Sequence, residues 1–140
     1  MGIDIEALMK AVDNDENEGL LDIDFEEINR IKNDMLQRVG FGRETLKKYN
    51  KSLKSYRYID EIPDIKFGRY VRWIPLKDPR KIKLTNGGIV CDVKIGDDVS
   101  VVCRNSLHRL FEFKMAECLV FQKMSDQELV LLSALSYLKK

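Results

Sequence analysis

The chain has 140 residues, of which 44% are hydrophobic and 34% are charged. This length and composition predict one folded domain, or one domain with an arm, and are too apolar for a disordered chain. The apolar runs fall far short of the roughly 20 residues of a membrane span, and no basic stretch followed by an apolar block indicates a secretory signal. We therefore expect no membrane partner and no secretion. Three widely spaced cysteines suit a reducing compartment better than a disulfide scaffold.

The net charge of +1 conceals three segments of different charge. Residues 1–40 hold 4 basic and 11 acidic side chains, residues 41–86 hold 13 basic and 5 acidic ones, and residues 87–140 hold 7 of each. Two interpretations stay open. The acidic segment could fold against the basic one and neutralise it, or the two could face separate partners, in which case the basic segment favours phosphate groups or an acidic protein.

The N-terminal part of the chain predicts helices. A short amphipathic helix is expected over residues 3–12, and the polar tract that follows at 13–19 predicts a loop or linker. Asp24 can cap a second helix over 24–39, in which apolar residues recur every three or four positions. The glycines of 40–42 end it. A third helix over about 43–56 would complete a helical hairpin or one sharply bent helix.

From Lys66 onward the hydrophobic period changes from near 3.6 to 2, which predicts strands. Five or six short antiparallel strands are expected to close as a small barrel or a strongly curled sheet. Asn86-Gly87 predicts a two-residue hairpin, because both turn positions favour positive φ. The expected strands lie at 69–76, 81–85, 89–95 and 99–103, and around 111–113 and 119–121.

Ser125-Asp126-Gln127-Glu128 forms a capping box, in which the serine hydroxyl accepts from the amide of Glu128 and the Glu128 carboxylate reaches back. The helix that it begins, 125–138, carries leucines around much of its circumference. Such a helix either covers the sheet or buries a second face in a partner subunit.

The expected fold class is α+β, with an N-terminal helical arm and hairpin, a small antiparallel sheet or barrel of five or six strands, and a C-terminal capping helix. The helical arm would comprise residues 1–60, acidic over 1–40 and basic over the helical segment 43–57. The small β domain with its C-terminal helix would comprise residues 61–140.

Few residues suggest catalysis or metal binding. One histidine and three cysteines without a Cys-x-x-Cys pair do not predict a zinc site. Strand alternation instead places Cys91 and Cys103 on the inward face of neighbouring strands, as core thiols. His108 with Cys103 or Cys118 would be a thiolate–imidazole pair, but no strained turn places a cysteine at a helix start. We therefore expect no enzyme, no metal, no cofactor and no small-molecule substrate.

A basic, tyrosine-rich stretch is the strongest candidate for binding. Lysines and arginines neutralise phosphates, and aromatic rings stack on unpaired bases. The alternative is that Tyr49 and Tyr56 share a helical stripe with leucines and face the core, which leaves the lysines as a solvated face. The pI of about 7.6 is also below that of dedicated nucleic-acid-binding proteins. The candidate residues, for a protein or a nucleic acid, are Lys47, Lys48, Lys51, Lys54, Arg57, Tyr58, Arg69, Arg72 and Trp73.

Protein interaction is the second class of function that the pattern favours. The leucine-rich helix end at 129–138 and the short helix at 3–12, tethered by an acidic linker, could each dock in a groove of a neighbour. The simpler alternative is that these helices complete the core of their own domain.

Several stretches together resemble proteins of one viral group. They are Gly68–Leu76, Leu84–Ile89 and Cys103–Asn105, together with Phe121–Glu128 and Ser133–Leu135. In these stretches the chain resembles small uncharacterised proteins of nucleocytoplasmic large DNA viruses, the giant viruses, over roughly residues 55–140. The resemblance carries no functional residues. It implies a virus that replicates in a reducing host cytoplasm, and it favours a role in virion assembly or with the genome over metabolism.

The sequence therefore predicts a non-enzymatic protein-interaction or assembly module, viral and acting in the virion or the host cytoplasm. Its partner would be another protein or a second copy of the chain, held by the terminal helices and attracted by the basic residues of 47–72. The alternative prediction is a nucleic-acid-binding module that uses the same stretch, 47–72.

Overall fold

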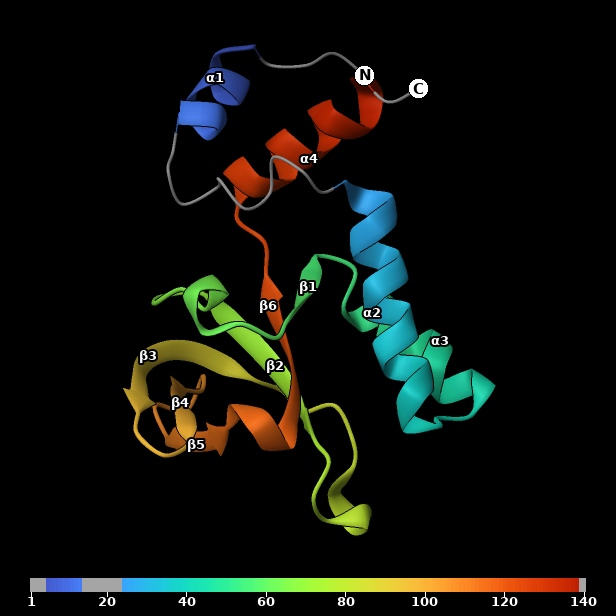
Figure 1. The fold of residues 1–140 in the computed structure, drawn as a ribbon, viewed down its shortest axis with the longest axis vertical. Helices are drawn as coiled ribbons and strands as arrows, with labels where there is room; N and C mark the ends of the chain where they lie inside the picture. The colour runs from blue at the N-terminus through green and yellow to red at the C-terminus, as the bar shows by residue number, and fades with distance from the viewer. Residues whose placement is uncertain (1–4, 14–23, 139–140) are drawn as a thin grey trace.

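The computed structural model describes residues 5–13 and 24–138 and has an α+β fold, which confirms the predicted class (Figure 1). The expected helix start at residue 3 and the polar tract over 14–19 lie outside the described residues. The helices are α1 (Ile5–Asp13), α2 (Phe25–Val39), α3 (Arg43–Ser52) and α4 (Asp126–Leu138). The strands are β1 (Tyr56–Ile59), β2 (Tyr70–Pro75), β3 (Gly88–Ile95), β4 (Val99–Arg104), β5 (Leu110–Lys114) and β6 (Cys118–Lys123).

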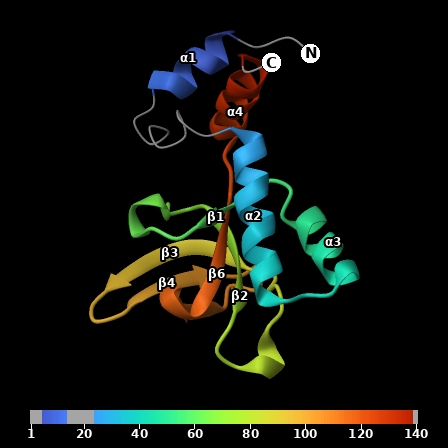
Figure 2. The same cartoon turned by 45° about the vertical axis from the view of Figure 1, so that its right-hand side comes forward.

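The strands of the described chain form one antiparallel sheet in the order β1-β6-β2-β3-β4-β5. The last strand, β6, thus lies between the first two, where Val120 pairs with both Ile59 and Trp73. Figures 1 and 2 show the sheet curling, with β3, β4 and β5 bent around β2 and β6. The concave face holds the main apolar core, in which Val71, Trp73 and Val120 meet Val101 of β4 and Phe113 of β5.

Helices α2 and α3 cover the opposite face of the sheet over β1, β6 and β2 (Figure 2). Leu36 of α2 and Leu53, which follows α3, pack there against Ile74 of β2 and Phe121 of β6. The turn between the two helices uses Gly40 at φ 90°, a left-handed conformation that glycine adopts without strain. The helical hairpin predicted from the sequence is therefore present, and its apolar side faces the sheet.

The capping box at the start of α4 is confirmed. The Glu128 amide donates to Ser125 Oγ at 3.1 Å, and the Ser125 amide donates to Glu128 Oε1 at 2.9 Å. Most contacts of α4 are with α1 and α2 rather than with the sheet (Figure 1). Leu131 packs against Ala11 of α1, and Leu132 packs against Ile28 of α2. Both terminal helices thus bury one side in their own chain.

The helix expected to reach Tyr56 ends earlier, at Ser52. Leu53 closes it and is fully buried, so the chain turns and Tyr56–Ile59 enters the sheet as β1. The first 60 residues therefore contribute an edge strand to the sheet in addition to helices. Tyr56 and Tyr58 face the α2–α3 side, whereas Ile59 faces the main core.

The strand expected at 81–85 and the two-residue hairpin at Asn86-Gly87 are both wrong. Residues 76–87 form a long connection with one 3₁₀ turn at Pro79–Lys81. Its apolar residues, Ile82 and Leu84, do not alternate in the sheet. They pack against the apolar residues beneath α2 and α3, among them Leu36, Leu53 and Phe121, which we call the α2–α3 cluster. Gly87 does have a positive φ, 82°, but its role is close approach, since a Cβ there would lie 2.1 Å from the Val71 carbonyl oxygen.

A β-bulge in β3 corrects the prediction for Cys91. The register with β4 shifts between Val90 and Asp92, so Cys91 is the extra residue and its side chain is exposed. Val90 before the bulge and Val93 after it both face the core, which simple alternation does not allow. Cys103 is buried in the core, as expected.

Candidate functional site

The four lysines at the end of the helical hairpin form one exposed group, which we call the lysine face. Lys47, Lys48 and Lys51 lie on α3 and Lys54 follows it, with successive spacings of one, three and three residues and four residues from Lys47 to Lys51. Helical spacing of three and four brings side chains to the same side of a helix. Leu46 and Tyr49 occupy the opposite side and pack into the α2–α3 cluster. The lysine face is therefore the solvent side of a helix anchored by its other side.

The acidic residues of α2 do not neutralise this face. Glu27 and Asp34 lie 3.7 and 3.6 Å from the guanidinium of Arg30 on the same helix. Among the described residues no ion pair joins positions 25–40 to positions 41–86, and none includes any of the four lysines. The ion pairs of α2 are thus internal to that helix, and the described residues show no pairing of α2 with the basic segment.

Buried polar contacts hold α3 in place. Lys32 of α2 is 2% exposed, and its Nζ donates to the carbonyls of Leu53 at 2.7 Å and Tyr56 at 3.0 Å. Burial lowers the pKa of Lys32 to about 8. Asn50 Nδ2 also donates to Asn33 Oδ1 at 3.1 Å. These bonds set the angle of α3 to α2 and the start of β1.

The connection before β3 adds basic residues that sequence reasoning did not nominate. The Leu84 amide donates to the Tyr49 hydroxyl at 3.2 Å, so this connection packs beside α3. It carries exposed Lys81 and Lys83, which form no ion pair with the described residues. Their one sequence signal was the excess of basic residues over 41–86. The strand expected at 81–85 did not predict a contact with α3.

The predicted arginines are engaged in structural contacts. The Arg57 guanidinium lies 3.6 Å from Asp64, and only 11% of the Arg57 side chain is exposed. Arg69 pairs with Glu128, the buried carboxylate of the α4 capping box. Arg72 Nε donates to a carbonyl of the β2–β3 connection at 2.8 Å. The structure therefore does not gather these arginines onto the lysine face.

The predicted aromatic residues pack against other rings. Trp73 is 8% exposed and stacks on Phe113, with ring centroids 4.4 Å apart. Tyr58 lies 5.9 Å from Phe121, centroid to centroid, in the α2–α3 cluster. Neither ring is available beside the lysines for stacking on a base. This arrangement agrees with the core-facing alternative for the tyrosines.

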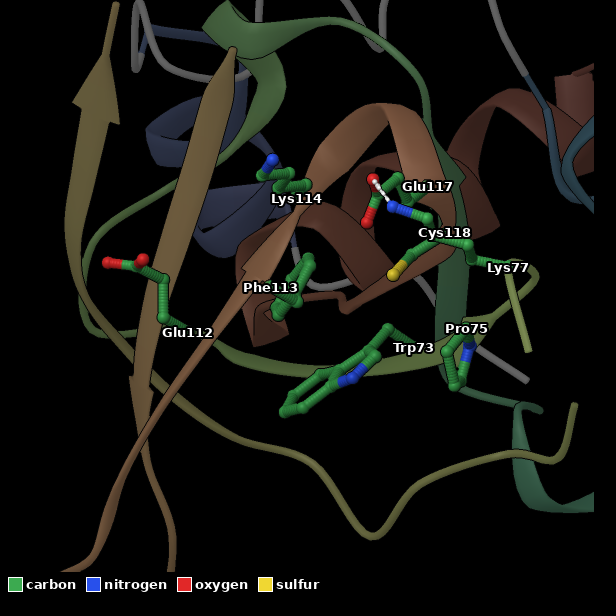
Figure 3. A pocket seen from close by; sticks show the side chains of 8 residues that line it. All are labelled: Trp73, Pro75, Lys77, Glu112, Phe113, Lys114, Glu117 and Cys118. Atoms are coloured by element: carbon green, nitrogen blue, oxygen red, sulfur yellow. Dashed lines mark hydrogen bonds and ion pairs between the residues drawn. The ribbon is translucent and has the colours of Figure 1, made fainter. Parts of the chain in front are cut away.

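A shallow hollow of about 390 Å³ lies between the end of β2 and β5 (Figure 3). Figure 3 shows Trp73 and Phe113 beneath it, the Cys118 sulfur pointing toward them, and an ion pair at its rim. That pair joins Lys77 Nζ to Glu117 Oε1 at 3.3 Å. Burial, with the nearby Glu117 carboxylate, raises the pKa of Cys118 to about 11, so this cysteine is a neutral thiol rather than a nucleophile.

The other nucleophile candidate is equally unreactive. Burial raises the pKa of Cys103 to about 12, with a smaller contribution from Cys91. His108 lies exposed in the turn between β4 and β5, where its amide donates to the Asn105 carbonyl at 3.0 Å, whereas Cys103 is buried in the core. Within residues 5–13 and 24–138, no three metal-ligating side chains of the His, Cys, Asp or Glu types converge.

Acidic side chains gather at the far end of the strands. A second hollow, of about 580 Å³, has Asp60 after β1 and Asp97 and Asp98 in the β3–β4 turn at its margin. Arg104 and Lys123 lie at the opposite ends of β4 and β6 and are exposed. Asp98 pairs with Lys114 at 3.4 Å, whereas Asp60 and Asp97 form no ion pair with a described residue, so the sheet is polarised along its strands from this acidic end to a basic end next to the lysine face.

The chain matches no protein-family model, no curated protein and no solved structure, so its own residues carry the functional argument. No helix in the described ranges combines the length and the apolar character that crossing a bilayer requires.

Proposed function

We propose that this protein is a non-enzymatic binding module that holds the phosphate backbone of a nucleic acid on the lysine face of α3. The observation that carries the proposal is that Lys47, Lys48, Lys51 and Lys54 are exposed and form no ion pair with any described residue, although acidic residues of α2 are close along the chain. When such lysines neutralise phosphates, the counterions condensed on the nucleic acid are released. This release is the main source of sequence-independent affinity.

The neighbouring connection extends the same chemistry. Lys81 and Lys83 lie next to α3, so the basic surface available to a phosphate backbone extends beyond the lysine face. The neutral thiols of Cys103 and Cys118 add no reactive group. If the resemblance to giant-virus proteins holds, a genome-associated role in the virion or the host cytoplasm fits this surface.

A protein-interaction or assembly role is the second candidate, and a different surface favours it. Ile5 and Met9 of α1 and Tyr137 and Leu138 of α4 are largely exposed, although the other sides of both helices pack together. Such apolar side chains on two adjacent helices could dock a protein partner or a second copy. The lysine face would then attract an acidic partner.

Oligonucleotide binding measured by fluorescence anisotropy across a salt titration tests the first proposal. We expect K47A/K51A to lower the salt slope of log K by about 1.4–1.8, which corresponds to two lost phosphate contacts. K94A/K114A is the matched control, because it removes two lysines that are already paired with Glu112 and Asp98. The control should bind as the unmodified chain does.

The absence of binding at low salt would overturn the nucleic-acid proposal. If K47A/K51A binds as the unmodified chain does, the lysine face is not the surface that binds the nucleic acid. Light scattering across protein concentration then tests the second candidate, for which I5S/L138S should shift a self-associating chain toward the monomer. A monomer at all concentrations would argue against a second copy as the partner.

A further inference from the structure

One row of residues crosses the whole sheet at its basic end. Lys123 pairs with Tyr56 of β1, and the β2–β6 register, continued by one residue, places it beside Tyr70. Directly paired residues point to the same face of a sheet. We call this set the cross-strand row. Its members, from β1 to β5, are Tyr56, Lys123, Tyr70, Ile89, Arg104 and Leu110.

The row lies on the outer face of the sheet. The residues next to it along the strands, Val71, Val90 and Cys103, point the other way and are buried in the main core. Helices α2 and α3 cover the outer face near β1, but the β3–β5 half is open (Figure 2). There Ile89 is 39% and Leu110 67% exposed.

The row combines apolar side chains with unpaired positive charge. Lys123 and Arg104 are exposed, and their side chains form no ion pair with any described residue. No acidic residue belongs to the row. The Tyr70 hydroxyl donates to the Asn86 carbonyl at 2.8 Å, which fixes its ring on the surface between the two cations.

The row continues the lysine face without a break in the chain. Lys54 precedes Tyr56 by two residues, so the row begins where α3 ends. Five strand-to-strand steps of about 4.8 Å give it a length of about 24 Å. A flexible polyanion bound on α3 therefore has a direct path across the sheet, away from the acidic end formed by Asp60, Asp97 and Asp98.

We propose that the cross-strand row is the second half of the binding site and that the ligand is a single-stranded nucleic acid. This inference rests on the proposed function. Phosphates would lie on Lys54, Lys123 and Arg104, and unpaired bases would lie against Tyr70, Ile89 and Leu110. A duplex conceals its base faces within its own stack, so it gains nothing from the apolar members of the row, whereas a single strand stacks its bases on rings, guanidinium planes and apolar surface.

The test compares an oligothymidylate with a duplex of the same length, both fluorescently labelled, on the unmodified chain and on two pairs of variants. I89S/L110S removes apolar surface from the row. I62S/I95S is its matched control, since Ile62 and Ile95 are equally large, are 36% and 73% exposed, and lie outside the row. Loss of this apolar contact should weaken single-strand binding by roughly 5- to 30-fold and leave duplex binding unchanged.

R104A is a second, independent variant, chosen because Arg104 is exposed and contributes no side-chain contact to the core. It should lower the single-strand salt slope by about 0.7, one phosphate contact. Circular dichroism checks that each variant is folded, and if I89S/L110S is not, R104A alone decides.

Three results separate the possible failures. If K47A/K51A loses binding while the row variants bind both oligonucleotides normally, the proposed function stands and the row is overturned. If the row variants weaken single-strand and duplex binding equally, the single-stranded class is overturned. If the unmodified chain binds neither oligonucleotide, the proposed function itself fails, and the row with it.

Discussion

Helices α2 and α3 are neighbours in one hairpin, yet they satisfy their charges in opposite ways. In α2, Glu27 and Asp34 pair with Arg30, and Ile28, Lys32 and Leu36 are buried. In α3 no residue is fully buried, and its lysines form no ion pair with the residues that the structure describes. Helix α2 is therefore explained by the fold alone, whereas the surface of α3 is not. An excess of unsatisfied charge on an anchored helix points to a ligand supplied from outside.

The largest expected effect is a difference in unfolding free energy between a core substitution in α2 and one in α3. Leu36 is fully buried in the α2–α3 cluster, so L36A should lower the free energy of unfolding by roughly 2–5 kcal/mol. Leu46 on α3 is only half-buried, and L46A should cost markedly less. Urea denaturation followed by Trp73 fluorescence measures both. Equal losses would mean that α3 is as much a part of the core as α2.

The pH dependence of stability should reveal the buried lysine of α2. Because the pKa of Lys32 is about 8 in the folded chain and 10.5 when unperturbed, the unfolded chain holds more protons between these values. Stability relative to K32M should therefore rise as pH increases from about 8 to about 10.5, by up to about 3 kcal/mol in total. A flat difference between the two proteins over this range would contradict the burial of charge at Lys32.

A buried ion pair between the sheet and α4 provides a contrast to the exposed lysines. Glu128 is 3% exposed in its side chain and pairs with Arg69. R69M would leave this carboxylate buried without its cation, at a cost of about 2 kcal/mol after allowance for the exposed part of Arg69. A double-mutant cycle with E128Q measures the coupling. Additive losses would show that the pair contributes no stability of its own.

The smallest effect is expected at the lysine face itself. K47A/K51A removes two exposed side chains that form no ion pair, so the free energy of unfolding should change by less than about 0.5 kcal/mol. Thermal unfolding measures it. A large destabilisation would give these lysines a structural role and weaken the inference that they serve a ligand.

Local signals in the sequence predicted much of the fold. The capping box at Ser125, the glycine turn at Gly40 and the α+β class follow from chemistry within a few residues, and all three are confirmed. Features that depend on distant contacts were missed. β1 needs β6 as its partner, and the bulge at Cys91 depends on pairing with β4, so neither leaves a signal in its own segment.

In the candidate site, too, only the features that depend on local spacing could be predicted from the sequence. The lysines of α3 were predicted because helical spacing alone puts them on one side. The packing of Trp73 on Phe113 and the pairing of Arg69 with Glu128 were not, because these partners lie far away in sequence. For the same reason the cross-strand row has no sequence signature: Lys123, Ile89 and Arg104 meet only through the strand register.

The central position of β6 also determines when the chain can fold. Among the described strands, β1 pairs only with β6, and five residues of β2 pair with β6 as well. During synthesis from the N-terminus, β1 and one edge of β2 stay open until Cys118–Lys123 has been made. Such long-range pairing slows folding and exposes strand edges meanwhile. A nascent chain of this protein would therefore remain prone to aggregation until Cys118–Lys123 pairs with β1 and β2, unless a chaperone protects it.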